Sequence, residues 1–348
     1  MRIALIGDKF SKTEGGIPRY CHELLTGLIK KGLDVEVISP KSMKIPFRDV
    51  FNHAIRLPYI MSKKANDFDL VHATAPITAL SFPLIKIAKV VTYHDLFSLL
   101  YRKDSISKHV IISAPLFLKI GKYADRIIAV STQTRDEIAK YLKIPKEKIA
   151  VVNLGVDDRF RPFNKGEKDR DYYTIGYVGS LAYRKRVDYL IKAFYILKKK
   201  HPKLKVKLII GGAKKFEYSK LIELVGKLNL VKDVEFMGFI PEDRLVETYN
   251  SFDIFVLPSD WEGFGLPILE AQRCGVPVII RENARIPREV AKCCVKVRSV
   301  EDMADKMYEL LTDLNLRTKI IKDGLEYSKL FTWKKTIEKT IKIYGEIL

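Results

Sequence analysis

Short apolar runs alternate with amphipathic helical patterns along most of the chain, and this alternation restricts the fold more than any other feature. Strand–helix alternation of this kind indicates a parallel sheet with helices on both faces. We therefore predict an α/β fold in the first part of the chain. Its apolar runs occupy residues 3–6, 35–38, 70–72, 90–93 and 127–130, and its helical patterns occupy residues 17–30, 107–122 and 132–142.

A second series of apolar runs follows a break in this pattern. Residues 155–171 combine Gly, Pro, Asn and charged residues without a hydrophobic period, which is typical of a connection between domains. We predict two Rossmann-like domains, residues 1–157 and 172–331, joined by a linker at residues 158–171. The second series comprises residues 175–178, 206–210, 234–237, 254–257 and 276–280.

The last segment, about residues 332–348, has the pattern of an amphipathic helix. Its apolar residues Trp333, Ile337, Ile341 and Tyr344 fall on one helical face. Such a face needs a surface to cover it. We expect this helix to pack back on the first domain.

The chain is strongly basic, with a formal net charge of +20 over 348 residues. This charge indicates an anionic partner: a membrane surface, a nucleic acid or a phosphorylated substrate. A lysine-rich solubilising or thermophilic surface accounts for the same charge and stays open.

The compartment is predicted from three further features. No run of eighteen or more apolar residues reads as a membrane-spanning helix, and the apolar start of the chain is too short for a signal peptide. The four cysteines lack the CxxC spacing of a zinc site, and a chain of this size needs no disulfide staples. We expect a cytoplasmic protein, with attachment to the inner face of the membrane as an open alternative.

Residues 258–271 read as a strand end, a glycine loop and a short helix. Gly263 and Gly265 allow backbone amides to approach a ligand, and the helix N-terminus adds unpaired N–H groups, so the segment predicts an anion cradle. Glu262 in the loop and Glu270 in the helix direct two carboxylates toward one ligand. Taken alone, this pair is better explained as an ordinary strand–turn–helix that carries two surface glutamates.

Three consecutive cations, Arg184, Lys185 and Arg186, follow the strand at residues 175–178 and precede a helical pattern. Fixed cations stabilise the charge that builds on a departing diphosphate, and we select Arg184 and Lys185 for this role. A solvated basic face is the alternative for such a run in a lysine-rich chain.

Four segments in register resemble family 4 glycosyltransferases of the GT-B fold, and the resemblance spans nearly the whole chain. They are residues 124–131, residues 152–157, the Gly-Ser-Leu…Arg-Lys run at 179–185, and the two glutamates Glu262 and Glu270. The resemblance implies two Rossmann-like domains facing an inter-domain cleft. It also implies a retaining, metal-independent transfer of a hexosyl group from a nucleotide-diphosphate sugar to a glycan, lipid-linked or small-molecule acceptor, without a cofactor.

The resemblance also implies roles for single residues. Gly15 and Gly16 match a glycine loop near the donor phosphate and the acceptor, and His94 matches a histidine that contacts the transferred sugar. Arg184 and Lys185 match the diphosphate clamp. Arg186 stands where many members have glycine or asparagine, so the resemblance does not divide the roles among the three cations.

The remaining donor contacts are assigned to the second domain. The resemblance has Glu262 orienting the sugar and Glu270 binding the ribose, while the backbone of residues 236–240 reads the base. The donor-binding residues implied there are Gly238, Phe239, Ile240, Glu262, Gly263, Phe264, Gly265, Leu266 and Glu270.

Two other segments have simpler interpretations than the sites they resemble. Asp67 and Asp69 have the DxD spacing of a metal site in a different transferase fold, but they precede an apolar run and are interpreted as a strand start, so we predict no metal. Residues 109–120 are apolar with flanking lysines; a buried or interdomain helix is favoured over one lying on a membrane.

Two alternative functions stay open. One is a GT-B-like sugar-nucleotide epimerase or hydrolase, which would bind the same donor. The other is a basic nucleic-acid-binding or membrane-binding protein with an idle cleft. Nucleic acid is disfavoured because the sequence shows no zinc-finger pattern and no aromatic ribonucleoprotein motif.

Overall fold

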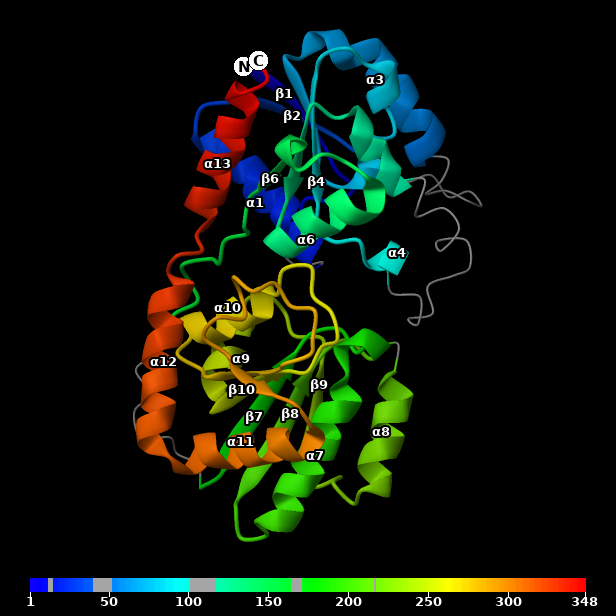
Figure 1. Cartoon of the computed structure of the whole chain (residues 1–348). Helices are drawn as coiled ribbons and strands as arrows, with labels where there is room; N and C mark the ends of the chain where they lie inside the picture. Colours follow the sequence, from blue (N-terminus) through cyan, green and yellow to red (C-terminus); the bar gives the residue numbers. More distant parts are fainter. Residues whose placement is uncertain (12–14, 40–51, 101–116, 164–170, 216) are drawn as a thin grey trace. The chain divides into compact units, whose positions relative to one another are not determined.

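A computed structural model describes residues 1–11, 15–39, 52–100, 117–163, 171–215 and 217–348 (Figure 1). Its chain divides into two units, the first made of residues 1–155 and 332–348 and the second of residues 156–331. Most of the apolar segment predicted at residues 109–120 lies outside the described residues.

The first unit is built on a six-stranded sheet whose strand order is β2-β1-β3-β4-β5-β6, with every pair parallel. Residues 3–6 are completely buried, as expected for a strand covered on both faces. The α/β class predicted from the sequence is confirmed. The strands are β1 (Arg2–Ile6), β2 (Asp34–Ile38), β3 (Leu70–Ala73), β4 (Ala88–Tyr93), β5 (Arg126–Ala129) and β6 (Ile149–Val151).

The helices of the first unit include an element from the far end of the chain. The α-helices are α1 (Gly16–Lys30), α3 (Leu57–Lys64), α4 (Phe97–Leu100), α6 (Thr132–Glu137) and α13 (Trp333–Gly345). The short 3-10 and π turns are η1 (Asn52–Arg56), η2 (Ala65–Asp67), η3 (Pro76–Ala79), η4 (Phe82–Leu84), η5 (Ile120–Tyr123), η6 (Ile138–Leu142) and η7 (Lys146–Lys148).

Helix α13 packs against α1, and Figure 1 shows the two side by side in red and blue. Gly27 of α1 leaves the room that Ile337 fills, because a Cβ atom at this position would overlap the isoleucine side chain. The hydroxyl of Thr336 donates to the carbonyl of Asn153 at 2.8 Å. Trp333 and Ile341, expected on the apolar face of this helix, are only partly buried.

A chain of buried polar side chains joins α13 to the sheet. Tyr344 Oη lies 2.6 Å from Nδ1 of His72, and Nε2 of the same ring lies 2.8 Å from Thr92 Oγ1. Thr92 Oγ1 in turn lies 2.9 Å from Tyr20 Oη. Burial lowers the pKa of His72 to about 3, so the ring is neutral and joins its two neighbours with one donor and one acceptor nitrogen. The network ties α13, β3, β4 and α1 together.

We expect Tyr344→Phe to lower the free energy of unfolding by about 1–3 kcal/mol, because it leaves a ring nitrogen of His72 buried without its partner. Urea denaturation measures the change. The exposed Tyr59 of α3 provides a control, since Tyr59→Phe alters a side chain in water. Equal stabilities of the two variants would contradict the role of this hydrogen bond.

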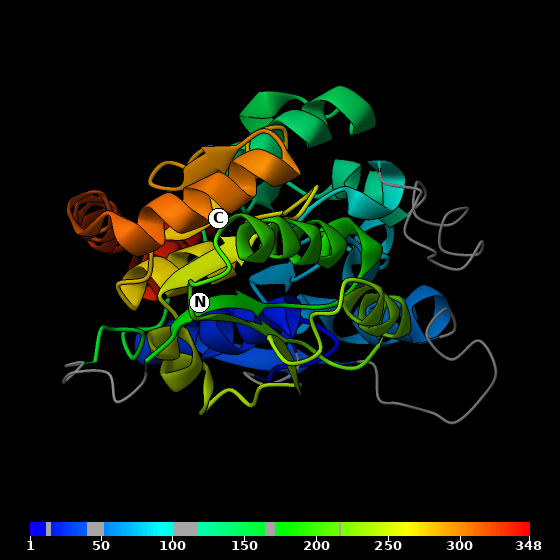
Figure 2. The same ribbon diagram turned by 90° about the horizontal axis from the view of Figure 1, so that it is seen from below.

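The second unit repeats the architecture with the strand order β12-β11-β10-β7-β8-β9, again entirely parallel. Its strands are β7 (Tyr173–Val178), β8 (Val206–Gly211), β9 (Val234–Gly238), β10 (Ile254–Leu257), β11 (Val278–Arg281) and β12 (Val295–Val297). Its helices are η8 (Tyr183–Lys185), α7 (Val187–Lys200), α8 (Tyr218–Lys227), α9 (Leu245–Ser251), α10 (Leu266–Arg273), α11 (Val300–Thr312) and α12 (Leu314–Ser328). Helices α7 and α11 pack side by side, in green and orange (Figures 1 and 2).

The start of the predicted linker is packed onto the second unit. Arg273 pairs with Asp158 at 2.8 Å, and the amide of Phe163 donates to Asn250 Oδ1 at 2.8 Å. Residues 158–163 are therefore held by side chains of the second unit, and residues 164–170 lie outside the described residues.

Candidate active site

The second sheet has a switch point between its adjacent strands β7 and β10. The chain continues from β7 to β8 and β9 on one side, while β10 leads to β11 and β12 on the other. Open α/β sheets bind ligands at the carboxyl ends of the strands at such a point. Two segments follow these strand ends: the clamp turn, residues 183–186 after β7, and the glutamate loop, residues 258–265 after β10.

A buried ion pair joins the clamp turn to the glutamate loop. Nζ of Lys185 lies 2.6 Å from Oε1 and 2.8 Å from Oε2 of Glu262. Each side chain is only 10% exposed. One cation of the predicted clamp therefore meets the loop glutamate directly.

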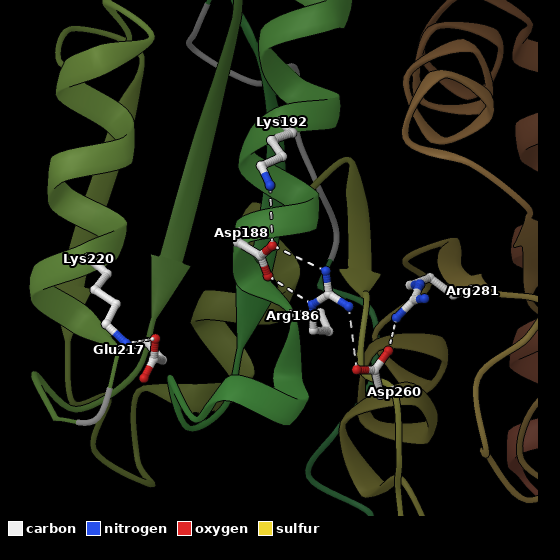
Figure 3. A network of polar contacts seen from close by, with 7 residues as sticks. All are labelled: Arg186, Asp188, Lys192, Glu217, Lys220, Asp260 and Arg281. Atoms are coloured by element: carbon white, nitrogen blue, oxygen red, sulfur yellow. Dashed lines mark hydrogen bonds and ion pairs between the residues drawn. The ribbon is translucent and has the colours of Figure 1, made fainter. Parts of the chain in front are cut away.

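Arg186 has different partners from Lys185 (Figure 3). Its Nε and Nη2 lie 3.0 and 3.2 Å from the carboxylate of Asp188, and its Nη1 lies 3.5 Å from Oδ2 of Asp260. Oδ1 of Asp260 accepts a hydrogen bond from Arg281 at the end of β11. The structure thus pairs Lys185 with the loop glutamate and places Arg186 in a separate network.

The charges of this network reinforce one another. Burial alone would raise the pKa of Asp188, but hydrogen bonds from Arg186 and its positive charge outweigh burial and hold this pKa below its ordinary value. The same hydrogen bonds raise the pKa of Arg186. Both side chains are therefore ionised at neutral pH.

The glutamate loop leads into α10 through a glycine in the left-handed region. Gly265 has φ = 103° and precedes Leu266, the first residue of the helix. A side chain at position 265 would be strained at this φ. Phe264 is buried against Phe331, whereas Gly263 is partly exposed. This turn places the first amides of α10 beside the loop that carries Glu262.

Glu270 lies within α10 and is 4% exposed. Its Oε2 accepts a hydrogen bond from the hydroxyl of Tyr249 at 2.8 Å, and this tyrosine of α9 is fully buried. The tyrosine therefore orients the carboxylate that the resemblance assigns to the ribose. Sequence reasoning missed Tyr249 because it lies on another helix, 21 residues earlier.

The residues predicted to read a base stand at the end of β9. Gly238 has φ = 73°, and its carbonyl accepts from the amide of Gly212 at 2.8 Å. Phe239 is 61% exposed, while Ile240 is buried in the space that Gly211 leaves. The exposed ring of Phe239 and the backbone turn at Gly238 therefore both lie at the carboxyl end of β9.

The first unit carries the other predicted residues at the carboxyl ends of its strands and at a helix start. Gly15 and Gly16 are exposed at the beginning of α1, and a Cβ atom at either position would meet no other atom within 4 Å. His94 follows β4, and its Nε2 lies 2.9 Å from the carbonyl of Thr74. The ring of Tyr20 meets the imidazole edge-on at 4.9 Å.

The tautomer of His94 follows from these contacts. Burial lowers the pKa of His94 to about 4, so the ring is neutral at pH 7. A carbonyl oxygen only accepts hydrogen bonds, and Nε2 must therefore carry the proton that it donates to Thr74. Nδ1 is left as an acceptor, suited to a hydroxyl group.

We expect the first unit to lose stability on mild acidification. The folded pKa values of His72 and His94, about 3 and about 4, lie below the ordinary value of 6.5, so below pH 6.5 the unfolded chain binds protons that the folded chain does not. The contribution of the two histidines to the free energy of unfolding is complete above pH 6.5. It is lost as the pH falls toward their pKa values in the folded protein. Together they should lower the free energy of unfolding by about 2 kcal/mol between pH 6.5 and 5.5.

Urea denaturation at the two pH values checks this expectation in the wild type and in His94→Asn. The variant should show about half of the wild-type decrease, because one of the two histidines no longer titrates. An undiminished decrease in the variant would show that other groups cause it.

No group of three His, Cys, Asp or Glu side chains is arranged to hold a metal ion in the described part of the chain. Asp69, one of the two DxD aspartates, accepts a hydrogen bond from the amide of Arg2 at 2.7 Å. Among the same residues, no helix is both long enough and apolar enough to cross a bilayer.

Two family models match the chain in succession. The model of glycosyltransferase family 4 matches residues 14–160, and the model of glycosyl transferases group 1 matches residues 158–327. The O-antigen chain mannosyltransferase B of Escherichia coli is 28% identical over 231 residues, which are 64% of this chain and 60% of that protein. The matched part thus spans less than two thirds of the relative's length.

Two solved structures share the fold over nearly the full length. Sucrose-phosphate synthase from Thermosynechococcus elongatus has a TM-score of 0.81 at 20% identity, covering 99% of this chain and 98% of that one. Anabaena HepE, solved in complex with UDP-glucose, has a TM-score of 0.77 at 18% identity, covering 99% and 100%. At these identities the likeness shows the fold.

Proposed function

This chain belongs to the group 1 glycosyltransferases of the GT-B type, and on that premise we propose that it transfers a hexosyl group from a nucleoside diphosphate sugar to a hydroxyl acceptor. The observation that carries the proposal is the buried pair of Lys185 and Glu262 at the switch point of the second sheet. The pair sets a cation and a carboxylate beside the N-terminus of α10, where an anionic diphosphate and a sugar hydroxyl have complementary partners.

In the proposed reaction the bond between the anomeric carbon and the diphosphate oxygen breaks, and the acceptor oxygen bonds to the same carbon. The acceptor attacks from the face that the diphosphate leaves, so the anomeric configuration is retained without an enzymic nucleophile, and the departing phosphate oxygen takes the acceptor proton. Arg184 and Lys185 stabilise the charge on the leaving diphosphate. Glu262 accepts hydrogen bonds from the sugar, and Nδ1 of His94 accepts one from a sugar hydroxyl. We propose that no metal ion takes part.

The comparisons support the donor class. A protein of the same fold is solved with UDP-glucose, and a relative is named a mannosyltransferase. We infer a nucleoside diphosphate hexose as donor, with Glu270 on the ribose and residues 238–240 at the base. A glycan, a lipid-linked sugar or a small polyol supplies the acceptor hydroxyl.

A thermal-shift series with UDP-, GDP- and ADP-hexoses tests the proposal. One nucleotide series should raise the melting temperature of the wild type, because a ligand that binds the native state stabilises it by about 2.7 kcal/mol at one hundred times its Kd. Glu270→Ala should abolish this shift. Glu247→Ala should keep it, because Glu247 of α9 forms an exposed ion pair with Arg244, the residue that precedes this helix.

Analysis of the products then separates transfer from the alternatives. A new glycoside with an added acceptor is the expected product. Free hexose or an epimerised donor as the main product would instead favour the hydrolase or epimerase. No shift with any donor at millimolar concentration would contradict the proposed function.

A further inference from the structure

Three segments of the second unit meet at Asp260. Its amide donates to the carbonyl of Arg184 in the clamp turn at 2.8 Å, and its own carbonyl accepts from the amide of Arg285 at 2.8 Å. The amide of Glu262 donates to the carbonyl of Arg285 at 2.9 Å. The backbone of the glutamate loop is thus bonded on one side to the segment after β7 and on the other to the segment after β11.

The side chain of Asp260 connects the same segments a second time. Figure 3 shows its carboxylate between the guanidinium groups of Arg186 and Arg281, one on each oxygen. It is 21% exposed, so this contact is largely shielded from water.

Both arginines are themselves anchored on the first turn of α7. Arg186 is held by two hydrogen bonds to Asp188, and the guanidinium of Arg281 lies 4.7 Å from the centre of the Tyr189 ring. Asp260 is therefore tied to α7 by two independent routes.

We infer that Asp260 is a positioning residue, which holds the glutamate loop against the clamp turn so that Glu262 and Lys185 meet the donor in register. The inference rests on the proposed function. Without the negative charge of Asp260, the glutamate loop would lose its attraction to both guanidinium groups, which would then face each other across a neutral side chain, and the loop would no longer be held against the clamp turn. A misplacement of about 1 Å lowers a transfer rate about 100-fold.

Hydrogen exchange of the ligand-free protein tests the positioning directly. In Asp260→Asn we expect amides of the glutamate loop to exchange at least about tenfold faster, with the interior strand β8 unchanged. Glu217→Gln is the matched control, because it weakens the 2.9 Å ion pair with Lys220, drawn in the same view, which lies outside both segments. Unchanged exchange in the glutamate loop would overturn the inference, whichever ligand the protein binds.

Kinetics then test whether Asp260 acts through Glu262. Asp260→Asn should lower kcat about 10- to 100-fold and change the donor KM by less than about threefold, and Asp260→Glu, which keeps the charge, should recover part of the loss. In a Glu262→Gln background, Asp260→Asn should lower kcat by less than about threefold. Full additivity of the two substitutions would overturn the inference.

The two experiments also separate this inference from the proposed function. If the wild type binds no donor and forms no product, the proposed function fails, and the exchange experiment still decides whether Asp260 holds the loop. If the Asn variant does not fold, Arg281→Gln takes its place in both experiments, because it removes one of the two guanidinium partners of the Asp260 carboxylate, with the exchange of β8 as the measure of an intact fold. Unchanged exchange in the glutamate loop of this variant would overturn the inference.

Discussion

Replacing Glu262 by glutamine is expected to lower the rate of sugar transfer about 100-fold at saturating donor. In the wild type both carboxylate oxygens of Glu262 lie within hydrogen-bonding distance of Nζ of Lys185, at 2.6 and 2.8 Å. The amide replaces one of these acceptors by an N–H donor and removes the negative charge. Product formation per folded protein, with the folded fraction taken from circular dichroism, measures the effect.

The same substitution should reduce stability, because Lys185 keeps its charge in a buried position without its partner. Breaking a buried pair lowers the free energy of unfolding by about 3–5 kcal/mol. Glu309→Gln is the control, since it interrupts an exposed pair with Lys306 on α11. A Glu262→Gln enzyme with the transfer rate of this control would contradict a role for Glu262 at the donor.

Replacing Gly155 by alanine should lower the free energy of unfolding by more than about 3 kcal/mol. A Cβ atom at this position would overlap the backbone nitrogen of Trp333 and the carbonyl carbon of Thr332, and would lie 2.6 Å from the Cα atom of Trp333. Backbone atoms cannot rotate aside as side chains do. The substitution must therefore displace the start of α13 from the first unit, and urea denaturation measures the loss.

Gly226→Ala is the matched glycine control. Gly226 lies within α8, and a Cβ atom there would meet no other atom within 4 Å. Alanine is a better helix former than glycine by about 1 kcal/mol, so this variant should equal or exceed the wild type in stability. A Gly155→Ala protein as stable as this control would show that the close approach can relax.

The longer strands could be predicted because each is a run of consecutive apolar residues, which the local sequence shows by itself. The strand expected at residues 254–257 coincides with β10, and the one expected at residues 206–210 is β8 without its last glycine. Two of the four edge strands, β6 and β12, were not predicted, because three residues are too few to establish a pattern.

The site could be predicted only to the level of its motifs. Lys185 and Glu262 were both selected, but their direct contact spans 77 residues of sequence and follows from the adjacency of β7 and β10. Asp260 stands two residues before Glu262 and gave no signal of its own, since its partners come from other strand ends. The roles assigned to these residues at the donor remain predictions.

Helix α13 is synthesised after all the other elements of the first unit, although it packs on α1, which is synthesised near the start. His72 emerges from the ribosome early, yet the tyrosine that bonds its ring is translated 272 residues later. Until then the nascent first unit lacks the helix that covers Gly27 of α1 and the partner that satisfies a buried imidazole. Its folding is completed only after Tyr344 has been translated. A stop codon before residue 333 would therefore damage a unit whose other elements are encoded before residue 156, and a nascent first unit would remain exposed to chaperones and proteases throughout synthesis of the second.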